Sequence, residues 1–248
     1  MLKEFFTHFH LVGATLGAPL GDAMVADTCG VEAQQLMVRH IDVPNIELSQ
    51  IPTFLDSVGV ELTPIDKVNL EAFPYRPNVQ FRLVSTDEGL VLHYHVEERT
   101  VAAVATGDNG RVWEDSCVEF FCTPDSDGVY YNMECNCAGT LLVGAGRERS
   151  NRQHAPQEVL DGVGRWSSLG RGSFAERQGP FVWDVVLSIP YGTFFLHDLK
   201  SLSGRNVAAN FYKCGDKLRT PHYLSWNPID LPKPNFHTPQ FFGTLRFE

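Results

Sequence analysis

The stretch that decides the fold of this chain is residues 112–121, which read Val112-Trp113-Glu114-Asp115-Ser116-Cys117-Val118-Glu119-Phe120-Phe121. A tryptophan stands beside two acidic residues, and an alternating segment follows that ends in aromatic residues. Because successive side chains of a β-strand point to opposite faces, this segment is predicted to be a strand with two distinct faces. One face carries Val118, Phe120 and Cys122, and the other carries Cys117, Glu119 and Phe121. A carboxylate at the centre of such a strand indicates a special role for the face that carries it.

A second alternating segment follows after the turn signal at residues 123–128, which is rich in Pro, Asp and Gly. In this segment Tyr131, Met133 and Cys135 share one face, and the other face carries Tyr130, Asn132, Glu134 and Asn136. The two segments are predicted to form a hairpin with one apolar face and one face of Glu and Asn side chains with aromatic edges. Such a polar face suits a ligand made of hydroxyl groups and C–H faces.

The rest of the chain also reads as short strands separated by turns. Strands are predicted at residues 36–41, 79–83, 90–96, 181–189, 207–213 and 243–247, and a short helix capped by Ser49 has Pro52 in its first turn. Residues 147–177 and 219–240 are predicted to be mainly long loops. This pattern predicts an all-β protein, an antiparallel β-sandwich with long loops and one or two short helices. Residues 1–36 are expected to be a loosely ordered N-terminal extension, and residues 37–248 a single domain.

Composition excludes some classes of function. The net charge of −10 argues against a nucleic-acid surface, which needs clustered basic residues, and no apolar run is long enough for a membrane span. The six cysteines lack the paired C-x-x-C units of a structural zinc site, so reduced thiols used as small core residues are expected. Residues 11–20 are apolar, but Glu4, His8 and His10 interrupt the region that a signal peptide would need. A cytoplasmic location is therefore favoured over a periplasmic one.

The predicted hairpin, together with residues 210–216, 225–228 and 241–245, resembles the family 9 carbohydrate-binding modules. More closely, the chain resembles the free-standing family 9-like proteins of Bacteroides-type bacteria. The resemblance covers residues 37–248, and its most specific parts are the Trp-Glu-Asp-x-x-Val-Glu-Phe-Phe strand and the closing Phe-Phe-Gly-Thr-Leu strand. It implies a DOMON-like β-sandwich, of the immunoglobulin or jelly-roll kind, that binds a saccharide.

The resemblance also implies a set of ligand-binding residues. In the xylanase-attached members two Trp side chains sandwich a terminal sugar ring, while Glu, Arg and Asn or Gln side chains bind its hydroxyl groups. Carried over to this chain, the site is expected to contain Trp113, Glu119, Asn132, Asn136, Arg147, Trp226 and Asn227. Arg149 is as close in sequence as Arg147. The implied role is recognition of a saccharide, at a chain end, in carbohydrate catabolism beside separate glycoside hydrolases.

Other chemistries remain open from the sequence. No cofactor is required, but calcium supports the fold in the attached modules, and Asp125 and Asp127 are candidate ligands here. A glycoside hydrolase would need two carboxyl groups from among Glu114, Asp115, Glu119 and Glu134, and nothing in the sequence selects a pair. A haem-binding DOMON-type electron-transfer domain is a third alternative, with Met133 as an axial ligand and no evident His partner.

Overall fold

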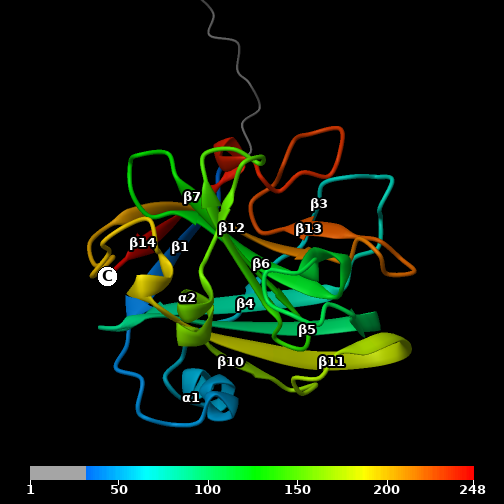
Figure 1. The fold of residues 1–248 in the computed structure, drawn as a ribbon, viewed down its shortest axis with the longest axis horizontal. Coiled ribbons are helices and arrows are strands. Elements are labelled where there is room, and N and C mark those ends of the chain that lie inside the picture. The colour runs from blue at the N-terminus through cyan, green and yellow to red at the C-terminus, as the bar shows by residue number, and fades with distance from the viewer. Residues whose placement is uncertain (1–31) are drawn as a thin grey trace, which may run out of the picture. The chain divides into compact units, whose positions relative to one another are not determined.

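The computed structural model describes residues 32–248. The extension expected over residues 1–36 lies outside the described residues except for its last five, and Cys29 lies outside them as well. The described chain is a β-sandwich of two sheets, as predicted (Figure 1). Its helical parts are short, namely α1 (Ile51–Ser57), α2 (Gln157–Gly162) and four 3-10 turns, η1 (Leu48–Gln50), η2 (Val112–Glu114), η3 (Tyr191–Thr193) and η4 (Pro239–Phe241).

The first sheet holds the predicted motif hairpin at its centre. Its strand order is β14 (Gly243–Phe247), β12 (Asn206–Cys214), β6 (Cys117–Thr123), β7 (Tyr130–Asn136), β8 (Leu141–Gly146) and β9 (Gln153–His154). The short strand β13 (Tyr223–Ser225) pairs with β12 and with β3 (Lys67–Val68).

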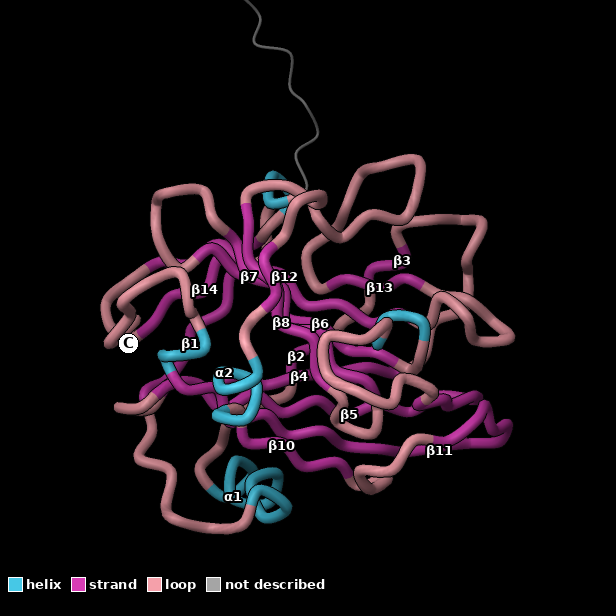
Figure 2. Tube along the Cα trace, in the orientation of Figure 1, coloured by secondary structure: helices cyan, strands magenta, loops and turns pink. Residues whose placement is uncertain are grey.

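The second sheet contains the other predicted hairpin. Its order is β4 (Asn78–Ser85), β5 (Gly89–Ala103), β11 (Phe174–Pro190) and β10 (Gly164–Ser167), and β2 (Thr63–Pro64) pairs with β4. Figure 2 shows this layer of long strands in the lower half of the view, crossed by the strands of the first sheet above it. The predicted strand at residues 181–189 is part of the long strand β11.

Strand β1 (Gln35–His40) departs from the antiparallel arrangement that the sequence predicts. Its first half pairs in parallel with β14, and its second half pairs in parallel with β4, so this one strand belongs to both sheets. The pairings between the other described strands are antiparallel. The sheet is therefore mixed where the two layers join, because chain segments far from β1 in sequence return beside it.

The alternation predicted for the motif hairpin is confirmed. Val118, Phe120 and Cys122 of β6 and Tyr131, Met133 and Cys135 of β7 all belong to the main core between the sheets. Aromatic rings join the two layers there: Phe81 of β4 stacks on Phe211 of β12 with 3.6 Å between ring centroids, and Phe120 stacks on the same residue at 4.9 Å. The five described cysteines are buried and carry free thiols, as expected.

A buried ion pair also joins the two sheets. The Lys213 ammonium on β12 lies 3.0 Å from a carboxylate oxygen of Glu98 on β5, and both side chains are fully buried. The Trp183 indole N–H donates to the other oxygen of Glu98 at 2.8 Å, and Lys213 donates to the His222 ring at 2.8 Å. Burial and the neighbouring Lys213 charge hold the pKa of His222 well below its usual range, so the imidazole accepts this bond in its neutral form.

The outer faces of the two sheets are covered differently. Helix α1 covers the second sheet, where Ile51 and Leu55 pack against Val84, Val91 and Val186. This helix has Pro52 in its first turn as predicted, but its N-cap is Gln50, which makes no side-chain cap, and Ser49 lies in η1. The outer face of the first sheet is left to loops. In the described residues no helix has the length and apolar character to span a bilayer.

We expect Lys213→Met to lower the free energy of unfolding by about 3–5 kcal/mol, because it leaves the Glu98 carboxylate buried without its partner. The double variant Glu98→Gln with Lys213→Met removes both charges and should recover most of this loss. Urea unfolding curves measure both effects. Lys67→Met, which breaks a half-exposed pair with Asp66, is the matched control and should cost about 1 kcal/mol or less. Equal losses in the single and double variants would contradict this account of the ion pair.

Candidate functional site

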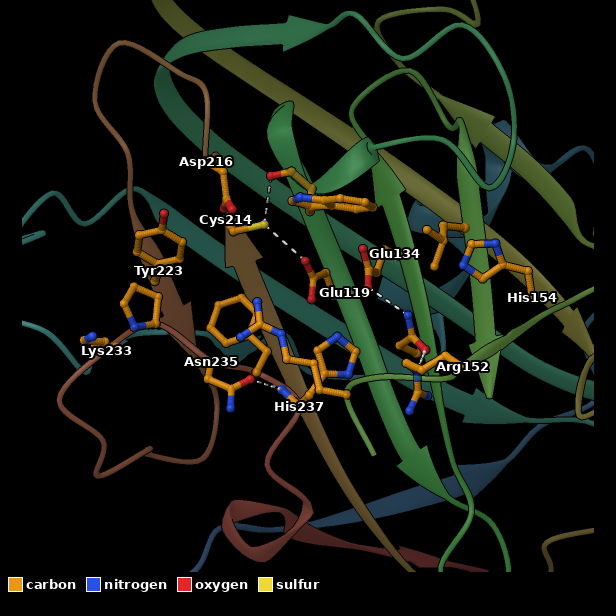
Figure 3. A pocket seen from close by; sticks show the side chains of 16 residues that line it. Glu119, Glu134, Arg152, His154, Cys214, Asp216, Tyr223, Lys233, Asn235 and His237 are labelled. Atoms are coloured by element: carbon orange, nitrogen blue, oxygen red, sulfur yellow. Dashed lines mark hydrogen bonds between the residues drawn. The ribbon is translucent and has the colours of Figure 1, made fainter. Parts of the chain in front are cut away.

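A cavity of about 740 Å³ lies on the outer face of the first sheet, over strands β12, β6, β7 and β8. The sheet supplies the floor, and loops on both sides supply the walls. In Figure 3, Glu119 and Glu134 stand at the centre, Tyr223, Lys233 and Asn235 on one side, and Arg152 and His154 on the other. The walls therefore come from the two segments that the sequence predicts to be long loops.

In the Pro-rich loop at residues 219–240, the segment from Asn227 to Phe241 is fastened at both of its ends by amide groups. The Asn210 side chain of β12 donates to the Asn227 carbonyl at 3.0 Å and accepts from the Asn227 N–H at 2.9 Å. The Asn227 side chain donates to the Phe241 carbonyl at 2.8 Å. In the middle of the loop, Phe236 stacks almost parallel on Tyr212 of β12 with 4.1 Å between centroids. These contacts fix the wall of the cavity before any ligand arrives.

Two carboxyl groups stand side by side on the floor. Glu119 of β6 and Glu134 of β7 are direct cross-strand partners, and side chains in such positions have Cβ atoms about 4.5–5.5 Å apart. Both are almost fully buried, at 3% and 5% exposed. Glu119 accepts a hydrogen bond from the Cys214 thiol at 3.1 Å, and Glu134 accepts one from the Asn132 amide at 2.8 Å.

The surroundings of these carboxyl groups favour their protonated forms. Burial, the Cys214 thiol and Glu134 together raise the pKa of Glu119 well above its usual range. Burial raises the pKa of Glu134 to about 7, although the Asn132 amide and the Arg152 charge oppose the shift. Burial and the nearby Glu114 raise the pKa of Asp216, at the cavity edge after β12, to about 6. The floor is thus a set of acidic groups that share little positive charge.

Arg152 and Asn132 form the wall next to β8. The Arg152 Nε–H donates to the Asn132 side-chain oxygen at 2.8 Å, while its other N–H groups donate to the carbonyls of Tyr130, Gly146 and Glu148. A glycine makes room for this arrangement, since a Cβ at Gly144 would lie 2.6 Å from the Asn132 oxygen. Asn132 is therefore held rigidly, with its amide turned toward Glu134.

Trp113, Glu119 and Asn132, three of the residues expected from the sequence, come together in this cavity. Trp113 lies in η2, just before β6, and is half-buried. Its backbone carbonyl accepts from the Asp216 N–H at 3.2 Å and lies 3.5 Å from the Cys214 sulfur, which ties the turn to the end of β12. The indole is thus positioned by backbone contacts that do not depend on the ring itself.

Trp226 is a correction to the expected pair of facing tryptophans. Its side chain is 3% exposed and belongs to the main core, where it meets Phe81 and Phe211 edge-on. Strand β13 explains this placement, because Leu224 and Trp226 share the parity that points inward, whereas Tyr223 points outward into the cavity. Gly243 lies directly under the indole, and a Cβ there would be 2.7 Å from the ring, which accounts for the glycine of the closing strand.

Three other expected site residues also lie away from the cavity. Asn136 is fully buried, donates to Asp115 at 2.9 Å and accepts from the N–H groups of Ala138 and Thr140, so it closes the β7–β8 turn. Asn227 anchors the Pro-rich loop as described above. Arg147 is exposed and folds back to Asp127 in the β6–β7 turn, where its Nε–H donates to the backbone carbonyl at 3.1 Å.

The cavity also contains residues that the sequence reasoning did not select, namely Glu134, Leu142, Arg149, Arg152, His154, Cys214, Asp216, Tyr223, Lys233, Pro234, Asn235, Phe236 and His237. The hairpin pattern already places Glu134 on the same face as Glu119, and this was a usable signal. Of the two arginines that the sequence offers here, Arg147 and Arg149, it is Arg149 that lines the cavity. The loop residues carry no such signal, because their position depends on the anchoring contacts of the loop.

Asp125 and Asp127, the candidate calcium ligands, do not fit a calcium site. Asp125 accepts from the N–H and hydroxyl of Ser126. Asp127 accepts from the Val129 N–H at 2.9 Å and lies 3.4 Å from His197 and 3.6 Å from Arg147. Calcium takes six to eight oxygen ligands, but cationic and ring nitrogen groups occupy the surroundings of Asp127. Within residues 32–248, groups of three potential metal ligands occur instead at Cys117, Glu119 and Cys214 and at His40, Asp42 and Asp87.

The fold and the cavity define a class of protein, since a β-sandwich with an aromatic and carboxyl-lined cavity on one sheet is typical of carbohydrate-binding modules. The family model described as carbohydrate-binding family 9 matches residues 49–247. The chain belongs to this family, in agreement with the resemblance seen in the sequence.

Solved structures agree with this assignment. A protein of Bacteroides uniformis, described as a "putative carbohydrate-binding protein", is 51% identical over 87% of this chain and 100% of its own, with a TM-score of 0.84. A family 9 module of Caldicellulosiruptor kristjanssonii in complex with cellotriose is 12% identical over 87% of this chain and 94% of its own, with a TM-score of 0.52. A family 9 module of the same organism in complex with glucose is 14% identical over 87% of this chain and 96% of its own, with a TM-score of 0.51. At this level of identity the two complexes establish likeness of fold alone. No curated protein matched the chain.

We expect the contribution of Glu134 to stability to fall as the pH rises from about 4.5 to above 7, because the pKa of Glu134 in the folded state lies above its unfolded value. The favourable contribution of its protonated form is complete below about pH 4.5 and disappears as the pH passes about 7. Glu134→Gln keeps an acceptor for Asn132 without a titrating group, so it should become more stable relative to the parent protein as the pH rises, by at most about 3 kcal/mol. Urea unfolding at a series of pH values measures this. Parallel stability curves for the two proteins would contradict it.

Proposed function

We propose that this protein binds a saccharide in the cavity on the outer face of the first sheet. The observation that carries the proposal is the meeting of Trp113, Glu119 and Asn132 in one cavity, although they come from a 3-10 turn and two strands. Membership of carbohydrate-binding family 9 supports it, as do the complexes of a family 9 module of the same fold with cellotriose and glucose. Sugar rings offer C–H faces that stack on aromatic rings and hydroxyl groups that need several polar partners.

The aromatic surfaces in this proposal come from both sides of the cavity. Trp113 supplies one stacking surface, and Tyr223 and Phe236 on the Pro-rich loop take the place that the sequence had suggested for Trp226. Phe236 is stacked on Tyr212 and so is already rigid. Glu119, Asn132 and Glu134 would accept and donate hydrogen bonds to the hydroxyl groups between these walls. Preformed walls of this kind lower the entropy cost of binding.

The size of the cavity favours the end of a chain over its middle. Ligand pockets of about 300–1,000 Å³ enclose most of the surface of a small organic molecule, and this cavity of about 740 Å³ falls in that range. Figure 3 shows Arg152 at one side of it and Lys233 at the other. We infer that one or a few terminal rings enter, and that the protein serves glycan catabolism beside separate glycoside hydrolases.

The opposed carboxyl groups also bear on the alternative that the protein is itself a glycoside hydrolase. Glu119 and Glu134 form the carboxyl pair that the sequence could not select. A glycosidase needs one protonated and one ionised carboxyl group, and environments that separate their pKa values provide this. Here burial raises both pKa values, and the cavity supplies no group that keeps one carboxylate ionised by a close ion pair. Met133, the residue of the haem alternative, points into the main core. The geometry therefore supports binding best.

We expect Trp113→Ala to weaken saccharide binding at least about tenfold, because stacking adds roughly 0.5–1.5 kcal/mol to the burial of the ring. Calorimetric titration with cellotriose measures the change. Trp166→Ala is the matched control, since Trp166 is a similarly half-buried indole on β10 that packs against the α1 cluster instead of the cavity. Equal weakening in both variants, or none in Trp113→Ala, would contradict the role of Trp113. Thermal melts of both variants verify that they are folded.

Chain-end recognition makes a separate prediction about the ligand. Cellotriose whose reducing end has been converted to an open-chain alditol presents one altered terminus and one intact terminus, while an alkyl glycoside blocks the same end without opening the ring. We expect at least one terminal modification to weaken binding about tenfold or more when tested by the same titration. If neither modification weakens binding, the reducing end is not the recognised terminus, and if the affinity per chain rises in proportion to the number of internal rings, chain-end recognition as a whole is refuted.

A further inference from the structure

The acidic floor of the cavity has no matching positive charge. Glu119, Glu134 and Asp216 all line it, and in the described part of the chain none of the three has a basic side chain within 4.0 Å. Glu114 nearby differs, because Arg111 and Lys217 lie within reach of its carboxylate. Buried acidic groups in proteins are normally paired or bound to a cation. The missing partner is therefore expected to come from outside the protein.

Glu134 adds a second and independent observation. One of its carboxyl oxygens accepts from Asn132, but the other, Oε2, is buried and has no hydrogen-bond partner. The side chain is 5% exposed and lines the cavity. A buried polar atom without a partner costs about 1–3 kcal/mol. Such an atom beside a cavity marks the position of a donor that arrives with the ligand.

The basic residues of the cavity do not fill this position. The guanidinium of Arg152 lowers the pKa of Glu134 from a distance, but its N–H groups are directed to Asn132 and to three backbone carbonyls. Arg149 and Lys233 are exposed at the rim. His237 is held neutral, because burial lowers its pKa to about 3. The acidic side chains of the cavity are thus buried on its floor, whereas the exposed cationic side chains lie at its rim.

We propose that the saccharide bound here is an amino sugar, whose ammonium group lies against Glu119 and Glu134 and donates to the unpartnered Glu134 oxygen. This inference rests on the proposed saccharide binding and specifies its ligand class. An ammonium has three donors and a full charge, so it satisfies Glu134 and favours the ionised forms of the two carboxyl groups, which release their protons when it binds. A neutral hydroxyl offers one donor and no charge to stabilise the ionised forms, and an acetylated amine has lost the charge.

Three trisaccharides with the same β-1,4-linked gluco backbone test the proposal. Cellotriose, the trimer of glucosamine and the trimer of N-acetylglucosamine differ only in the group on C2 of each ring. At pH 7 we expect calorimetric titration to show the glucosamine trimer bound about 10- to 100-fold more tightly than the other two, the range for hydrogen bonds to charged groups. Titration in buffers with different ionisation enthalpies should also show protons released by the glucosamine trimer and not by cellotriose.

The groups that can release those protons are the three carboxyl groups whose pKa values burial raises, Glu119 on β6, Glu134 on β7 and Asp216 at the end of β12. The other titratable or charged groups that face these carboxyl groups are Cys214, Tyr223, Glu114, Arg149, Arg152, His154, Lys233 and His237. Glu134→Gln removes one of the three carboxyl groups and the unpartnered oxygen together. We expect it to reduce the affinity ratio between the glucosamine trimer and cellotriose to about 1, whereas Asp127→Asn, an acidic residue of the same hairpin outside the cavity, should leave the ratio unchanged.

The outcomes separate the two proposals. If cellotriose binds as tightly as the glucosamine trimer or more tightly, the amino-sugar inference is overturned and saccharide binding stands. The same holds if the ratio survives in Glu134→Gln or if both variants lower it equally. If none of the three trimers binds to the folded protein, the proposed saccharide binding fails for gluco-configured ligands, and the inference fails with it.

Discussion

Strict alternation of side chains along β6, β7 and β12 is the constraint on which the rest of this structure depends. Every second residue of these strands packs against the second sheet, so the residues between them must face outward. Glu119 and Glu134 are forced to stand together on the outer face, because a register shift of one residue would bury them in the aromatic core. The stacking of Phe81, Phe120 and Phe211 makes such a shift very costly. The position of the site thus follows from the packing of the opposite face.

Two buried carboxyl groups of this protein, those of Glu98 and Glu134, differ in the partners that surround them. Glu98 lies between the sheets with a Lys213 partner at 3.0 Å and an indole N–H on its other oxygen, and this arrangement joins the two layers. Glu134 lies on the outer face with one oxygen bonded and the other without a partner. Oε2 of either residue lacks a well-aligned hydrogen bond, but that of Glu98 lies 3.0 Å from the Lys213 ammonium, whereas in the described chain Glu134 has no basic side chain within 4.0 Å. This contrast is the reason for assigning a ligand to Glu134 and a structural role to Glu98.

The loops decide what kind of surface covers the acidic floor. Asn210 and Asn227 hold the ends of the Pro-rich loop, and the stack of Phe236 on Tyr212 holds its middle. Two amide side chains and one ring pair therefore replace the regular hydrogen bonding that a strand or helix would provide. Asn227 is important to the site for this reason, although it does not line the cavity.

The sequence by itself determined the two sheets, the hairpin at residues 117–136, the faces of its strands and the family, because these depend on a period of two residues and on local turn chemistry. It also identified Trp113, Glu119 and Asn132 as neighbours of the cavity, since strand parity and the resemblance agree on them. Only the tertiary structure decided that Trp226 is a core residue and that Tyr223 and Phe236 take the cavity wall. The physical reason is that contacts with β12 fix both features. Pairing with β12 sets which side chains of the three-residue strand β13 point inward, and stacking on Tyr212 of β12 holds Phe236 of the loop. The same applies to β1, whose two parallel partners, β4 and β14, are separated from it and from each other by long stretches of sequence.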